Sequence, residues 1–116
     1  MIDFESSETH FQFNPRLAER ERLWLEAAIF PNLRAHIWLA SSGTTGAGSG
    51  APSPDALKVI ALSKRAFLIA AAAANRHLQS AREDVWLNPL PPFHVGGLSI
   101  YARAYLTGAK VIVPPS

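Results

Sequence analysis

A run of fourteen small residues interrupts the chain between two apolar segments. It extends from Ser41 to Pro54 and reads SSGTTGAGSGAPSP, so no side chain in it is larger than threonine or proline. Side chains of this size cannot fill a core, and glycine and proline interrupt regular structure, so the run is expected to be a loop. The flanking segments, His36–Ala40 and Lys58–Leu62, are typical of buried strands. The run therefore predicts a strand, a loop and a second strand at the centre of the sequence.

The remaining segments alternate between helix and strand patterns. Ser63 is a favourable N-cap for a helix through an alanine-rich segment, and Gly108 is a favourable helix terminator. After residue 36 we expect strand, loop, strand, helix, strand, helix and strand, with the regular elements at 36–40, 58–62, 64–79, 85–88, 95–107 and 110–113. This alternation predicts an α/β fold with a mostly parallel sheet and helices packed on it.

The N-terminal third carries a weaker pattern. Residues 1–10 are polar and predict an irregular, poorly ordered start, followed by a short edge strand over 10–13. Asn14 and Pro15 predict the beginning of a helix that ends before Pro31 and turns Trp24 toward the core. We divide the chain into an N-terminal extension and helix, 1–35, and an α/β subdomain, 36–116, within a single domain. Trp38 and Trp86 are also expected in the core.

Composition excludes several classes of function. The chain has 116 residues, of which 48% are hydrophobic and 17% charged, so it is not a disordered tail. Its longest apolar run, residues 66–74, is too short to span a bilayer, and the acidic start does not resemble a signal peptide. Without cysteine it has no disulfide and no zinc–thiolate site. We expect a cytoplasmic protein without a membrane span.

The distribution of charged residues and histidines indicates which kinds of ligand the chain could bind. The formal net charge is +2, and the basic residues are scattered, which argues against nucleic-acid binding. The four histidines are also scattered and form no metal-binding pattern. His36 and His77 are expected to be structural or surface residues, and His10 to be exposed. A small anionic ligand is more plausible, because backbone amides can hold an anion with few charged side chains.

The small-residue run admits an anion site or a flexible linker. Glycine allows the backbone to approach a ligand closely, and successive amides with serine and threonine hydroxyls surround a phosphate well. The segment Gly43–Ser49 is close to the phosphate loop of nucleoside triphosphatases, but the lysine of that motif is missing, because Ser49 directly follows Gly48. Residues 46–50 also do not match the dinucleotide-binding pattern of spaced glycines.

Two segments together resemble a known family. LASSGTTG, residues 39–46, is similar to the phosphate-binding motif of the adenylate-forming acyl-CoA synthetase superfamily. PLPPFHVGGL, residues 89–98, is similar to the next motif of that superfamily, which borders the acyl-substrate pocket. The strand and alanine-rich helix between them, and the continuation through Val113, also fit. Within the superfamily, the segments look most like the o-succinylbenzoate–CoA ligases of menaquinone synthesis.

The resemblance implies a reaction and a set of site residues. Such enzymes join ATP and a carboxylic acid into an acyl-adenylate, release pyrophosphate, and pass the acyl group to CoA, with Mg²⁺ as cofactor. By resemblance, the β- and γ-phosphates would be held by Ser41, Ser42, Gly43, Thr44, Thr45 and Gly46. His94, Gly96 and Gly97 would border the acid pocket, with Gly96 and Gly97 letting the helix begin close to the substrate.

The sequence departs from the family where a phosphate-binding lysine is expected after Gly46. Lys58 or Lys64 is a candidate substitute. The chain reads as an N-terminal piece of a larger domain without the later catalytic motifs, and we expect no ligase turnover from it alone. Two alternatives stay open: a non-catalytic binding or assembly module derived from a ligase, and an unrelated phosphate-binding α/β protein. An uncovered sheet edge would favour self-association.

Overall fold

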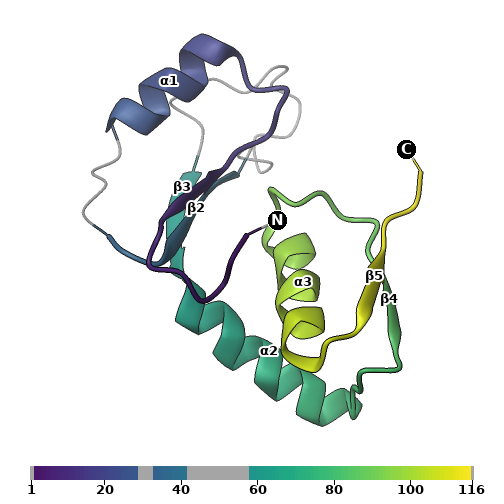
Figure 1. Ribbon diagram of the computed structural model, residues 1–116. Helices are drawn as coiled ribbons and strands as arrows, with labels where there is room; N and C mark the ends of the chain where they lie inside the picture. The colour runs from purple at the N-terminus through teal and green to yellow at the C-terminus, as the bar shows by residue number, and fades with distance from the viewer. Residues whose placement is uncertain (1, 29–32, 42–57, 116) are drawn as a thin grey trace.

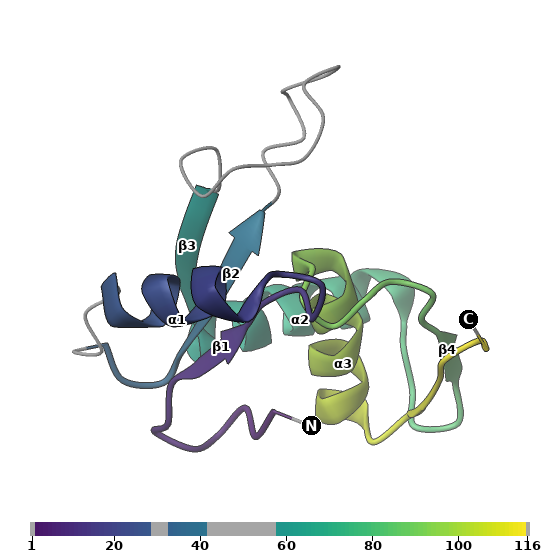
Figure 2. The same ribbon diagram turned by 90° about the horizontal axis from the view of Figure 1, so that it is seen from above.

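The structure, a computed structural model, describes residues 2–28, 33–41 and 58–115, and these form an α/β arrangement (Figures 1 and 2). In chain order the elements are β1 (His10–Gln12), α1 (Glu19–Ala28), β2 (His36–Ser41), β3 (Lys58–Ser63), α2 (Lys64–Leu78), β4 (Val85–Leu87), α3 (Val95–Thr107) and β5 (Lys110–Ile112). The element positions after residue 36 agree with the sequence pattern to within two residues.

The strands form two small sheets, and the expected mostly parallel sheet is not what the described residues build. One sheet has the order β1–β2–β3, in which β1 runs parallel to β2 but β2 runs antiparallel to β3. The other is the parallel pair β4–β5. The antiparallel pair has a simple cause. A parallel return requires a crossover, usually a helix, and no helix pattern separates β2 from β3.

Helix α2 begins and ends as its sequence predicts. The Ser63 hydroxyl accepts a hydrogen bond from the Ala66 amide at 3.0 Å, which caps the first turn. The helix ends at Gln79, which adopts the left-handed conformation, with φ of 55°. Its alanine face lies against α3, where Ala71 and Ala102 are both buried. Small side chains at this contact let the two helices approach closely.

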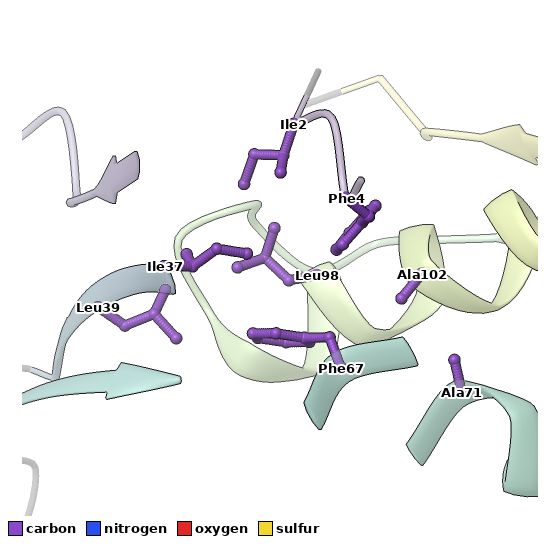
Figure 3. Close-up of a cluster of buried hydrophobic side chains, with 8 residues drawn as sticks. All are labelled: Ile2, Phe4, Ile37, Leu39, Phe67, Ala71, Leu98 and Ala102. Atoms are coloured by element: carbon purple, nitrogen blue, oxygen red, sulfur yellow. The ribbon is translucent and has the colours of Figure 1, made fainter. Parts of the chain in front are cut away.

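The core lies between the β1–β2–β3 sheet and the α2–α3 pair. It contains Ile37 and Leu39 from β2, Phe67 from α2, and Leu98 from α3 (Figure 3). Ile2 and Phe4 complete it from the N-terminal segment, so residues 2–9 are not the loose start that their polarity predicts. Burial of these two large apolar side chains stabilises the segment, while its charged residues, Asp3, Glu5 and Glu8, stay exposed to water.

Helix α1 differs from expectation in its start and its buried face. Asn14 accepts hydrogen bonds from the amides of Arg16 and Leu17, so it closes a turn, and the helix begins later, at Glu19. Leu25 is buried, whereas Trp24 is 55% exposed, which corrects the prediction that Trp24 faces the core. Within the described residues, no helix has the length and apolar character needed to cross a membrane.

Candidate functional site

The β2–β3 pair brings together the two residues, Ser41 and Lys58, that flank the segment 42–57, which holds most of the small-residue run. Ser41 is the last residue of β2 and lies opposite Lys58, the first residue of β3. The chain therefore leaves and re-enters the sheet at adjacent positions. Five of the expected phosphate-binding residues lie outside the described residues: Ser42, Gly43, Thr44, Thr45 and Gly46. For Ser41 the structure gives the backbone pairing only.

The two candidate lysines lie at opposite ends of this hairpin. Lys58 is exposed beside Ser41, where its ammonium group is available to an anion. Lys64 follows Ser63, which pairs with His36 at the other end of the strands, about 17 Å away at the usual rise per strand residue. Lys64 is only 1% exposed, and its Nζ donates to the Ser6 carbonyl at 3.2 Å and the Ser6 hydroxyl at 2.8 Å. The Lys64 ammonium group is thus engaged by Ser6, which favours Lys58 as the candidate substitute for the phosphate-binding lysine.

His94 is the N-cap residue of α3 and is exposed. Its backbone is extended and its side chain makes no capping hydrogen bond, while its ring lies 4.9 Å from that of Phe93, centroid to centroid. The amides of the first helical turn therefore lack a side-chain acceptor from the N-cap. Such an end carries partial positive charge and favours a carboxylate or phosphate.

Gly96 and Gly97 are explained by packing of the turn that precedes the helix. A Cβ at Gly97 would overlap the Pro91 carbonyl oxygen, which is backbone and cannot move aside. A Cβ at Gly96 would lie 2.8 Å from Leu90 Cδ1, the tip of a flexible side chain. Gly97 is buried and Gly96 is exposed. The structure thus gives Gly97 a role in seating the proline-rich segment on α3, in addition to any contact with a ligand.

Asn88 holds the turn before α3 in place, and the sequence pattern did not single it out. It is fully buried, and its amide nitrogen donates to the Gly97 carbonyl at 3.1 Å. Its side-chain oxygen accepts from the Leu90 amide at 3.2 Å, and its backbone amide donates to the Ile112 carbonyl at 2.8 Å. These bonds join β4, β5 and the start of α3. A buried asparagine directly before a proline-rich turn is the signal that could have identified it.

The end of β2 and the start of α3 belong to one packed unit. Leu98, one turn after His94, lies beside Ile37 of β2 and Phe67 of α2 (Figure 3). Figures 1 and 2 both show the N-terminal end of α3 toward the same end of the molecule as the last residues of β2. The end of β2, where the small-residue run begins, and the start of α3, where His94 lies, are therefore directed toward the same end of the described fold.

The other histidines have structural surroundings. His36 Nδ1 lies 2.7 Å from the Arg34 carbonyl oxygen, and His77 is exposed. His10 is half-buried, which corrects the expectation of an exposed side chain, and its Nε2 atom is buried without a hydrogen-bond partner. Burial, followed by the nearby Lys64 ammonium, lowers the pKa of His10. The described residues contain no group of three or more histidine or acidic side chains that could hold a metal ion.

Comparison with known proteins adds no assignment: no family model matches the chain, and no curated protein matches it. The site is therefore interpreted from its own geometry and from the two motifs in the sequence.

Proposed function

We propose that the chain is part of an ATP-dependent, AMP-forming acid–CoA ligase, and that it carries the phosphate-binding segment and one border of the acid pocket. The observation that supports this most is the closure of β2 and β3 at Ser41 and Lys58. It keeps the residues that flank the glycine-, serine- and threonine-rich run at one place, as a loop around a polyphosphate requires, and it brings the exposed Lys58 to that place.

The second motif has a compatible geometry. The uncapped N-terminus of α3 at His94 favours an anionic group. In the proposed reaction that group is the substrate carboxylate, with a hydrogen bond from the His94 ring helping to orient it. The carboxylate attacks the α-phosphorus of ATP, the bond to the bridging oxygen breaks, and pyrophosphate leaves with its charge stabilised by the phosphate segment.

Mg²⁺ and CoA enter the proposal through the resemblance alone. The described residues offer no cluster of carboxylates for Mg²⁺, so no step is derived through it. The o-succinylbenzoate specificity likewise rests on the motif around His94. The proposal for this chain concerns binding of ATP by the phosphate segment.

Calorimetric titration of the 116-residue chain with ATP tests the proposal. We expect Lys58→Ala to weaken ATP binding by about fivefold, the loss of one partly exposed charge contact, while Arg65→Ala at the other end of the hairpin leaves it unchanged. Equal effects of the two variants, or no ATP binding by the wild-type chain, would contradict the proposal. Binding of inorganic phosphate as tightly as ATP would instead favour an unrelated phosphate-binding α/β protein.

A second candidate function is a non-catalytic assembly module, and one surface favours it. On the parallel β4–β5 pair, Trp86 and Val111 are half-buried, whereas Val85, Leu87 and Ile112 are exposed, with Leu87 at 63%. Parallel sheets are usually covered on both faces. Self-association through this sheet would appear in light scattering as a mass that rises with concentration and falls back to the monomer in Leu87→Lys. A constant monomeric mass would exclude it.

A further inference from the structure

One buried side chain, Asn88, holds both ends of the segment that carries His94. Its Oδ1 atom accepts from the Leu90 amide at 3.2 Å, and its Nδ2 atom donates to the Gly97 carbonyl at 3.1 Å, in the first turn of α3. The Asn88 backbone amide donates to the Ile112 carbonyl of β5 at 2.8 Å. Because Asn88 is fully buried, breaking one of these bonds leaves a polar group unpaired and away from water.

The segment depends on Asn88 because its own backbone has few hydrogen-bond donors. Residues 89–94 read PLPPFH, and proline has no N–H group. The His94 amide donates to the Pro91 carbonyl at 3.2 Å, and the same carbonyl oxygen leaves no room for a Cβ at Gly97. The position of His94 is therefore fixed by close packing of the segment against α3 and by the two side-chain bonds of Asn88.

A second buried asparagine bonds to α3 at a different place. Asn75 of α2 is 9% exposed, and its Nδ2 atom donates to the Arg103 carbonyl at 3.0 Å. Arg103 lies about 14 Å along the helix axis from His94, at the usual rise per helical residue. Both asparagines thus donate to a carbonyl group of α3, but only Asn88 does so beside His94. Asn75 is therefore a matched control for a role that is structural alone.

We propose that Asn88 is a positioning residue for the substrate carboxylate, because it fixes the His94 ring and the amides of the first turn of α3 in the arrangement that a carboxylate contacts. This inference rests on the proposed acid pocket and adds a residue that lies behind it. Asn88 itself is buried and does not touch the acid. A site held in this way loses affinity when its support moves by about 0.5–1 Å.

Titration with o-succinylbenzoate, followed by the NMR signals of the His94 ring, tests the proposal. The serine in Asn88→Ser is too short to reach both partners, and we expect this variant to weaken acid binding at least about tenfold. Asn75→Ser should also lower the urea midpoint, because it leaves the Arg103 carbonyl without its side-chain donor. It should change acid binding by less than about twofold, since the two positions are far apart. Equal losses of affinity in the two variants, or unchanged affinity in Asn88→Ser, would overturn the proposal.

Spectra recorded without the acid distinguish this inference from the proposed function. The Phe93 ring lies 4.9 Å from the His94 ring, centroid to centroid, and its ring current should shift the His94 ring protons from their values in an unstructured peptide. This shift should shrink in Asn88→Ser and persist in Asn75→Ser. A wild-type chain that shows the shift but no response to the acid would contradict the proposed acid pocket. An unchanged shift in Asn88→Ser would contradict positioning by Asn88.

Hydrogen exchange of the wild-type chain provides a test that needs no variant. The Leu90 side chain is 46% exposed, yet its amide donates to the buried Oδ1 atom of Asn88. We expect the Leu90 amide to exchange at least about tenfold more slowly than in an unstructured peptide. Exchange at the unstructured rate would show that Asn88 does not hold the segment, and it would overturn the proposal even if Asn88→Ser does not fold.

Discussion

At the scale of single residues, Gly97 controls how the His94 turn meets its helix. An added methyl group at Gly97 overlaps the Pro91 carbonyl oxygen, whereas one at Gly96 meets only the flexible tip of Leu90. We expect Gly97→Ala to lower the free energy of unfolding by about 1–3 kcal/mol through overpacking. Gly96→Ala should be close to neutral, because the gain in helix propensity offsets the contact. Urea denaturation measures both, and equal effects would contradict this packing.

Gln79 adopts a backbone conformation that suits glycine better. Its φ of 55° ends α2 in the left-handed region, and its side chain is exposed. Gln79→Gly should raise the free energy of unfolding by up to about 1 kcal/mol by relieving this strain. Ala72→Gly, at an exposed position inside the same helix, should lower it by about 1 kcal/mol. Thermal unfolding of the two variants should move in opposite directions, and a loss of stability in both would contradict the cap.

His10 makes stability depend on pH in a defined direction. Burial and the Lys64 ammonium lower the pKa of His10 in the folded chain below its ordinary value of 6.5, against smaller opposing effects of Glu8 and Asp3. As pH falls through 6.5, the unfolded chain binds the proton first, so the His10 contribution to stability is present above 6.5 and declines below it. Urea denaturation at pH 7.5 and 5.5 should show a smaller loss in His10→Gln than in wild type. A loss of the same size would contradict this assignment.

At the scale of elements, the sequence predicted where the helices and strands lie along the chain better than it predicted how the strands pair. Ser63, Gly108 and the apolar runs locate α2, α3 and the strands after residue 36, because caps and periodicity are local signals. The direction of β3 was missed, although the absence of a helix pattern between β2 and β3 was a local signal for an antiparallel return. α1 was misjudged because its apolar residues do not gather on a single face, so periodicity could not tell Leu25 from Trp24.

The side-chain contacts that the sequence could not predict are those with distant partners. Lys64 is buried because Ser6, 58 positions earlier, supplies two acceptors for its ammonium group. Asn88 acquires its role through Gly97 and Ile112. These pairings depend on tertiary packing, which a motif does not encode. The positions of His94 at the start of α3 and Lys58 at the start of β3 were predictable, because the limits of these elements depend on local signals.

At the scale of the whole molecule, the N-terminal segment joins the sheet to the helix pair. Phe4 is buried among Phe67 and other core residues, with ring centroids 6.3 Å apart, and Ser6 binds Lys64. Phe4→Ala should cost about 3–5 kcal/mol, a large part of the stability of a small domain. Phe11→Ala, at a half-buried position, should cost clearly less. Urea denaturation compares them, and equal costs would show that the segment is not part of the core.

We propose that the segment between Ser41 and Lys58 binds the polyphosphate of a nucleotide. The most direct measurement is a calorimetric comparison of ATP and AMP on the full chain, with Thr44→Val/Thr45→Val and the control Ser53→Ala. We expect ATP to bind at least about tenfold more tightly than AMP, and only the double threonine variant to lose this preference. Equal binding of ATP and AMP, or an unchanged preference in the threonine variant, would contradict it.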